Sequence, residues 1–260
     1  QDYKADGTGR LLEGKVVALI NEYTASAAEI VTGALQDQDR GWVVGRRSFG
    51  KGLVQRPIEF SDGSMIRLTI AHYYTPSGRC IQKPYKKGEN LDYVMDIEKR
   101  FEHGELYSAD SIHFADSLKY QTLRQHRTVY GGGGVMPDYF VPLDTTLTTR
   151  FHRQLLARSF IINANLSYVD AHRKELKKRY PTFDTFLRDF EVPQSVVDNI
   201  VAEAAKQNVK PKDEAELKAT MPALRAQLKA LVARDLWDMS EYFHIINERN
   251  AIVKKALTLF

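Results

Sequence analysis

A serine and a lysine are the residues of this sequence best placed to do chemistry. Ser26 ends the small-residue turn 21–25 and opens a segment with helical spacing, and Lys51 stands between two glycines. A serine at a helix N-terminus has free backbone N–H groups beside it, and these groups can stabilise an oxyanion. The N–H of Ala27 is the candidate donor. The pattern therefore indicates acyl transfer, with Ser26 as nucleophile and Lys51 as general base, and it requires no metal or cofactor.

Each of these residues also has an ordinary structural interpretation. Serine is a common N-cap whatever the function of the protein, and a lysine in a glycine-rich loop is usually a surface residue. Gly45, Gly50 and Lys51 have the spacing of a phosphate-binding loop, but Gly52 stands where that loop needs Ser or Thr, and a strand-like segment replaces the helix that should follow. Nucleotide binding is therefore disfavoured.

Composition sets the class of protein. The chain has 260 residues, 43% of them hydrophobic, which is enough for a buried core. Its 37 basic and 33 acidic residues give a net charge of only +4, so nothing in the charge predicts a nucleic-acid partner. No apolar run has the length of a transmembrane helix, and no signal peptide is visible. Cys80 is the one cysteine; we interpret it as a packing residue, and neither an internal disulfide nor a zinc cluster is expected.

The first half of the chain predicts an alternation of strands and one helix. Residues 15–20 form a continuous apolar run, typical of a strand buried on both faces. Residues 26–37 follow with helical spacing. Strands are predicted at 42–44, 53–60 and 64–74, the last two joined by a turn at 62–63. In the helix we expect Ala27, Ile30, Val31, Ala34 and Leu35 to face inward, and Gln36, Asp37 and, just beyond, Asp39 to face outward.

The second half of the sequence is irregular at first and then has helical spacing. Residues 81–130 are irregular, and a glycine run then leads into a short strand at 139–142. From residue 146 onward helical spacing dominates, and Pro193, Pro211 and Pro222 stand where helix starts or breaks are plausible. We therefore predict two domains: an α/β domain over 1–145 with an irregular insertion at about 81–130, and an α-helical subdomain over 146–260.

Four blocks of this sequence, in order, resemble the signature blocks of the C-terminal processing (tail-specific) serine peptidases. They are residues 21–37, 44–55, 73–79 and 133–138. The resemblance implies Ser26 as nucleophile, Lys51 as base and Gln55 as the residue that orients the lysine. It also implies a ClpP/crotonase-like mixed sheet followed by a helical C-terminal subdomain. Thr24 and Ala28 depart from the pattern, since family members often have further serines there.

The same resemblance implies properties that lie outside these blocks. The chain would be the carboxyl-terminal portion of a longer peptidase whose upstream part supplies a second oxyanion donor and a PDZ domain. The substrates would be polypeptides with unstructured C-terminal tails, cleaved in the bacterial periplasm or another extracytoplasmic compartment. Several family members assemble, so oligomerisation through the helical tail is an option that the resemblance allows.

The chemistry sets a requirement on the lysine. Only a neutral amine can accept the serine proton, and burial favours the neutral form. We therefore expect Lys51 to lie in an apolar pocket with no carboxylate beside it, and the neutral Gln55 to fix its amine by a hydrogen bond.

Two rival functions use the same features differently. A noncatalytic protein-binding scaffold would keep the fold and use Ser26 only as a helix cap. An acyl-CoA-handling enzyme of the crotonase-like class would use oxyanion amides and carboxylates without a Ser-Lys pair. Covalent labelling of Ser26 by a serine-acylating inhibitor separates the peptidase from the scaffold, and turnover of thioesters identifies the acyl-CoA enzyme.

Overall fold

The computed structural model describes residues 4, 6–9, 12–85, 88, 90–145 and 148–260. The chain divides into two compact units, Gln1–Leu143 with Lys255–Phe260, and Asp144–Lys254. The domain boundary predicted between residues 145 and 146 adjoins residues 146 and 147, which lie outside the described residues. Strands and helices together make a mixed α/β protein, which confirms the predicted class. The ClpP/crotonase-like layering stays a prediction.

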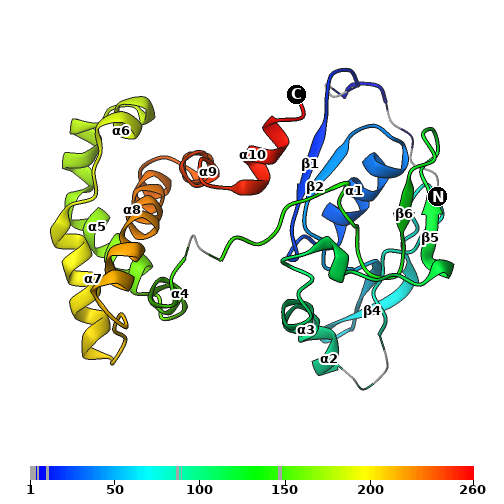
Figure 1. Ribbon diagram of the computed structural model, residues 1–260, viewed down its shortest axis with the longest axis horizontal. Helices are drawn as coiled ribbons and strands as arrows, with labels where there is room; N and C mark the ends of the chain where they lie inside the picture. The colour runs from blue at the N-terminus through cyan, green and yellow to red at the C-terminus, as the bar shows by residue number, and fades with distance from the viewer. Residues whose placement is uncertain (1–3, 5, 10–11, 86–87, 89, 146–147) are drawn as a thin grey trace. The chain divides into compact units, whose positions relative to one another are not determined.

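The first unit contains a small parallel sheet. Its strand order is β1 (Val17–Ile20), β2 (Trp42–Gly45), β7 (Tyr139–Phe140), with parallel pairing throughout. Helix α1 (Ala27–Asp37) connects β1 to β2 and lies beside them (Figure 1). Such a β-α-β connection brings the start of the helix to the carboxyl end of the first strand. The turn that carries Ser26 is therefore fixed by the sheet.

Two antiparallel hairpins and the long connection between β4 and β5, which we call the excursion, complete the first unit. Strand β3 (Leu53–Glu59) pairs with β4 (Met65–His72), with an irregularity in register between Val54 and Gln55. Strand β5 (Lys119–Gln121) pairs with β6 (Thr128–Tyr130). Between β4 and β5 lie α2 (Asn90–Val94), α3 (Asp96–Glu102) and two short 3-10 helices, Ala109–Ser111 and Asp116–Leu118. The segment predicted to be irregular therefore contains defined elements.

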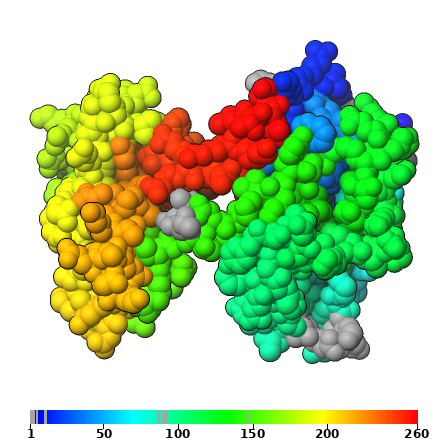
Figure 2. All heavy atoms as spheres, viewed as in Figure 1, coloured from blue at the N-terminus to red at the C-terminus, as the bar shows by residue number. Residues whose placement is uncertain are grey.

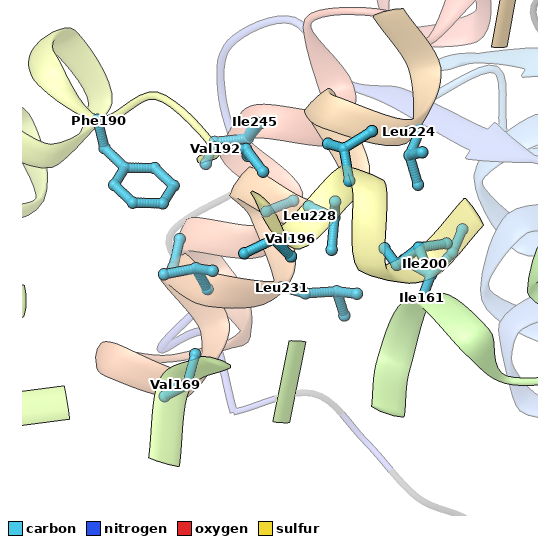
Figure 3. Close-up of a cluster of buried hydrophobic side chains, with 14 of the residues drawn as sticks. Ile161, Val169, Phe190, Val192, Val196, Ile200, Leu224, Leu228, Leu231 and Ile245 are labelled. Carbon is cyan, nitrogen blue, oxygen red and sulfur yellow. The ribbon is translucent and has the colours of Figure 1, made fainter. Parts of the chain in front are cut away.

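The second unit is helical. Its larger core cluster draws apolar side chains from several helices, and Figure 3 shows Leu224, Leu228 and Leu231 of α8 facing Ile161, Val196 and Ile200. The helices are α4 (Arg150–Ala157), α5 (Phe160–Arg179), α6 (Phe183–Asp189), α7 (Gln194–Lys206), α8 (Glu214–Leu236) and α9 (Met239–Asn247), followed by α10 (Ala251–Leu257).

Two local predictions are wrong. The strand at 15–20 was expected to be buried on both faces, but β1 is an edge strand of the described sheet and its Leu19 is 44% exposed. Pro222 was expected at a helix start or break, but it lies inside α8. Pro193 caps α7, as predicted.

The helical unit buries one histidine. His152 on α4 is 2% exposed, and its Nε2 lies 2.9 Å from Oε1 of Gln227. Burial lowers the pKa of His152 below its ordinary value, and the positive charge of Arg249 acts in the same direction, while the hydrogen bond that the imidazole donates to Gln227 opposes it. The folded unit therefore binds a proton at this imidazole less readily than the unfolded chain does.

This burial predicts acid sensitivity of the helical unit. Below the ordinary histidine pKa of about 6.5 the unfolded chain binds the proton more readily than the folded one, so stability falls as the pH falls. Urea unfolding followed by Trp237 fluorescence, in a Trp42→Phe background, should show a lower midpoint at about pH 5.5 than at about pH 7.5. His152→Gln should reduce this dependence and the exposed His172→Gln should not. An unchanged pH dependence in His152→Gln would contradict the assignment.

Candidate active site

The turn before Ser26 is fixed by its own hydrogen bonds. The N–H of Thr24 donates to the carbonyl of Asn21 at 3.0 Å, and the hydroxyl of Thr24 accepts from the N–H of Asn21 at 3.0 Å. The carbonyl of Thr24 then accepts from the N–H of Phe49 at 2.9 Å. The turn is thus closed internally and joined to the segment that carries Lys51.

Ser26 has an unusual backbone. Its φ and ψ are 59° and −123°, outside the region that residues with a side chain ordinarily adopt. Such a conformation costs on the order of 1–3 kcal/mol and persists where the surroundings enforce it, most often at functional sites. Strained serines at strand-to-helix turns are also the arrangement used by hydrolase nucleophiles. Ala27, the predicted oxyanion donor, is the first residue of α1 and is exposed, so its N–H lies in the helix turn that lacks intrahelical acceptors.

The carboxylate of Glu29 joins the two halves of the site. Glu29 is fully buried, and its Oε2 accepts from the N–H of Ser26 at 2.9 Å and from the N–H of Lys51 at 2.8 Å. Its Oε1 accepts from the N–H of Gly50 at 2.7 Å and from the hydroxyl of Ser48 at 2.5 Å. One oxygen therefore holds the backbones of Ser26 and Lys51 within two hydrogen-bond lengths of each other.

The glycines on both sides of Lys51 are required by close contacts. A Cβ on Gly50, which has φ +89°, would lie 3.0 Å from the N atom of Gly134. A Cβ on Gly52 would lie 2.9 Å from Cγ1 of Ile81. Both distances are too short for a side chain, so this loop packs against its neighbours only with glycine at these positions.

The surroundings of Lys51 differ in part from the prediction. The expectation that no carboxylate lies beside Lys51 is wrong, because Glu29 bonds to its backbone N–H. That carboxylate has its charge compensated by four donors, three of them amides that can only donate. Lys51 itself is half-buried, and among the residues that the structure describes its amine makes no hydrogen bond or ion pair.

Gln55 is separated from this arrangement. It lies on β3 at the irregularity in register, it is exposed, and in the described part of the chain it has no hydrogen bond to Lys51. The structure therefore brings together Ser26, Ala27 and the backbone of Lys51, and it leaves Gln55 on the hairpin.

The buried face of α1 is polar, contrary to the prediction. Gln36 and Asp37, expected to face outward, are 2% and 0% exposed, whereas Val31, expected to face inward, is 60% exposed. Arg79 explains this difference: it is fully buried, its guanidinium lies 2.8 Å from Oδ1 of Asp37, and it donates to Oε1 of Gln36 at 2.7 Å. Burial lowers the pKa of Arg79, and Asp37 opposes that change.

The buried polar side chains of Gln36 and Asp37 also form hydrogen bonds with two further sequence blocks. The second carboxylate oxygen of Asp37 accepts from the N–H and the hydroxyl of Ser77, at 3.0 and 2.7 Å. The amide of Gln36 donates to the carbonyl of Met136 at 2.9 Å and to Asp138 at 3.0 Å. Helix α1 is therefore bonded to the 73–79 block and to the 133–138 block through its polar face.

Sequence reasoning missed Glu29, Gln36, Asp37 and Arg79 as determinants of the site. One signal was available for Glu29: a serine followed three residues later by glutamate at the start of a helix is a capping-box pattern. For Gln36 and Asp37 the apolar spacing of α1 pointed to the wrong face, and the pairing of Arg79 with them over more than 40 residues has no local signal.

Comparisons with known proteins find relatives for part of the chain. Residues 1–94 match the family described as peptidase family S41, and residues 151–238 match a family of unknown function, DUF8443. The chloroplastic C-terminal processing peptidase of Tetradesmus obliquus is 47% identical over 96 residues, which are 37% of this chain and 20% of that protein. The carboxy-terminal-processing protease of Bartonella bacilliformis is 53% identical over 70 residues, 27% of this chain and 16% of that protein. The protease CtpA of Bacillus subtilis is 39% identical over 97 residues, covering 34% and 21%.

These matches confirm the resemblance to the C-terminal processing serine peptidases, as peptidase family S41, for the N-terminal part of the chain. The family match ends at residue 94, so the fourth predicted block, at 133–138, lies outside it. The chain spans about a fifth of the length of the curated relatives that it matches. In the described residues no helix has the length and apolar character needed to cross a membrane, and no cluster of three or more His, Cys, Asp or Glu side chains is arranged to hold a metal ion.

The role of Glu29 gives a prediction about stability. Glu29→Gln keeps the size of the side chain but replaces one accepting oxygen with an NH₂ group, which would face two donors. We expect a loss of about 2–4 kcal/mol in the free energy of unfolding of the first unit, since buried charge-assisted hydrogen bonds are replaced by unsatisfied donors. Urea unfolding followed by Trp42 fluorescence in a Trp237→Phe background measures it.

The exposed Glu175→Gln on α5 is the matched control and should change the unfolding free energy by less than about 0.5 kcal/mol. A Glu29→Gln protein as stable as the control would show that this carboxylate does not hold the site together.

Proposed function

We propose that this chain forms the carboxyl-terminal part of a serine endopeptidase that cleaves polypeptides through an acyl-enzyme. In this proposal Ser26 is the nucleophile, Lys51 the general base, Ala27 N–H an oxyanion donor and Gln55 the residue that orients Lys51. The observation that carries the proposal is the shared carboxylate of Glu29, which joins the backbones of Ser26 and Lys51. The match of residues 1–94 to peptidase family S41 supports it independently.

The chemistry follows from the groups named. Oγ of Ser26 attacks the peptide carbonyl carbon while its proton passes to Nζ of Lys51, and the oxyanion that forms accepts a hydrogen bond from Ala27 N–H. Lys51 then gives the proton to the leaving amine as the C–N bond breaks. Water attacks the ester with Lys51 again as base, which releases the acid and restores Ser26. Each step needs the amine of Lys51 without a competing partner, and an amine that makes no hydrogen bond or ion pair among the described residues meets that condition.

Gln55 has the weakest structural support of the four residues. It is exposed on β3, and among the described residues it makes no hydrogen bond to Lys51. We assign it the orienting role on the family resemblance and on its position four residues after Lys51.

Substrate class and setting are also proposals. Three relatives bear names that describe C-terminal processing, and we propose that the substrates are proteins with unstructured C-terminal tails. Since these relatives are about five times longer than the matched segment, we propose that the active enzyme has further segments, among them a PDZ domain. We propose an extracytoplasmic location, the periplasm in a bacterium, and regard oligomerisation through the helical unit as open to measurement.

Replacement of either proposed catalytic residue should abolish cleavage. With casein as an unstructured substrate and the full-length protein that contains this chain, Ser26→Ala and Lys51→Ala should each lower kcat/KM by at least about a thousandfold, because nucleophile and base act as one unit. Circular dichroism checks that both variants are folded.

The matched controls are the exposed Ser240→Ala and Lys210→Ala in the helical unit, which should cleave as the wild type does. A wild type that cuts while either active-site variant keeps most of its activity would show that the Ser-Lys assignment is wrong. A folded wild type that neither cuts nor reacts with a fluorophosphonate at Ser26 would favour the noncatalytic scaffold.

A further inference from the structure

The loop that carries Lys51 is held from two sides. We define the Lys51 loop as residues 47–52. On one side it bonds to the nucleophile turn and to α1, through Thr24 and Glu29. On the other side it contacts the excursion between β4 and β5, which carries α2 and α3. Figure 2 shows this excursion as part of the surface of the first unit.

Arg100 on α3 binds the backbone of the Lys51 loop directly. Its guanidinium donates to the carbonyl of Ser48 at 3.0 Å and to the carbonyl of Arg47 at 2.6 Å, and its side chain is 3% exposed. Glu105 lies 3.4 Å from Nε of Arg100. Burial lowers the pKa of Arg100 to about 10, and the neighbouring charge of Arg47 adds to that effect. A planar guanidinium presents its donors in a rigid fork that suits two adjacent carbonyls, whereas a lysine ammonium has no such fixed fork.

Lys83 holds the next part of the loop. Its N–H donates to the carbonyl of Gly50 at 2.9 Å, and its amine lies 3.7 Å from the centre of the Phe49 ring. The amine also donates to the carbonyl of Tyr93 at 2.9 Å and to Oδ2 of Asp96 at 3.1 Å. Since Lys83 is 5% exposed, these contacts are made in a largely dehydrated site, where a cation–π contact is stronger than at the surface.

Asp96 connects the two cations. Its Oδ2 lies 3.1 Å from the amine of Lys83 and 3.9 Å from Nη1 of Arg100, so this carboxylate at the start of α3 links the two buried cations, and Glu105 adds a second negative charge beside Arg100. The three residues therefore form one unit, which we call the clasp: Lys83, Asp96 and Arg100. The clasp binds the neighbours of Lys51 in the chain, and among the described residues none of its contacts involves the amine of Lys51 itself.

We propose that the clasp consists of positioning residues that fix the Lys51 loop, so that the excursion at 81–130 sets the place of the general base. The contacts themselves do not depend on the reaction, but their consequence for catalysis rests on the function proposed above. Glu29 fixes the N–H groups of the loop and the clasp fixes its carbonyls and the Phe49 ring. With both in place the backbone on either side of Lys51 has little freedom, so the volume that its amine can reach is restricted. A general base displaced by about 1 Å is expected to cost on the order of 100-fold in rate.

Hydrogen exchange of the Lys51 loop tests the clasp without reference to activity. Arg100→Met and Lys83→Met should raise the exchange rate of the amides of Phe49, Gly50 and Lys51 by about tenfold or more, because exchange of these hydrogen-bonded amides requires local opening. Arg225→Met is the matched control, since Arg225 donates to the carbonyl of Val192 in the helical unit and should leave these amides unchanged. Two variants are used so that the test survives if one of them fails to fold.

Kinetics test the consequence. In the full-length protein, variants that are folded should lower kcat by about 10- to 100-fold and change KM by less than about twofold, since the substrate-binding surface is retained. Arg100→Lys, which keeps the charge but not the planar fork of donors, should recover part of kcat, whereas a purely structural role would give no such split between kcat and KM.

The outcomes are distinct. Folded clasp variants whose loop amides exchange as in the wild type would overturn the proposal, and so would variants whose loop opens while kcat stays at the wild-type value. If the wild-type protein cleaves nothing, the proposed function fails, and the exchange rates alone still support or overturn the clasp as the element that fixes residues 47–52.

Discussion

The buried carboxylate of Glu29 is the constraint on which the arrangement of the site depends. It accepts hydrogen bonds from both sides of the site, at Ser26 on α1 and at Ser48, Gly50 and Lys51 on the following loop. A buried carboxylate is stable only when its oxygens accept hydrogen bonds. Separation of the two segments would remove some of the hydrogen bonds that the carboxylate of Glu29 accepts, and is therefore unfavourable. The strained backbone of Ser26 is tolerable in this setting, because its N–H donates a charge-assisted hydrogen bond to the carboxylate of Glu29.

The remainder of the first unit is also held together largely by buried polar contacts. Its described apolar cluster is small, consisting of Ile20, Val43, Ile81 and Val135, whereas polar side chains fill the space between α1 and the loops. Asp37 and Gln36 bind Arg79 there, and Asp138 accepts from the N–H of Val43 at 2.8 Å as well as from Gln36. Directional bonds of this kind define positions more narrowly than apolar contacts do, at the cost of sensitivity to the loss of any one partner.

The reliance on polar contacts between distant segments explains which predictions succeeded. The strand and helix pattern over the first half of the chain could be read from the sequence, because hydrophobic runs and turn residues reflect local physics. The inward face of α1 could not, because the spacing of Ile30, Val31 and Ala34 was taken to mean burial, and Val31 is exposed. Burial of Gln36 and Asp37 depends on Arg79, more than 40 residues later in the chain. Pairings over such distances have no signature in local periodicity, and the same limit hid the contact between Arg100 and the Lys51 loop.

The proposed site therefore draws on two kinds of structural support. Ser26 and Lys51 lie on segments fixed by buried hydrogen bonds, whereas Gln55 lies on the hairpin β3–β4, whose strand β4 is exposed at every residue. A two-stranded hairpin with both faces in water is marginally stable by itself, and here Ile58, Ile66, Leu68 and Ile70 are among its exposed side chains. The position of Gln55 is consequently the one that depends most on contacts beyond its own hairpin. The backbones of Ser26 and Lys51, the proposed nucleophile and base, are held by the carboxylate of Glu29, while Gln55, proposed to orient the base, needs its strand to be held as well.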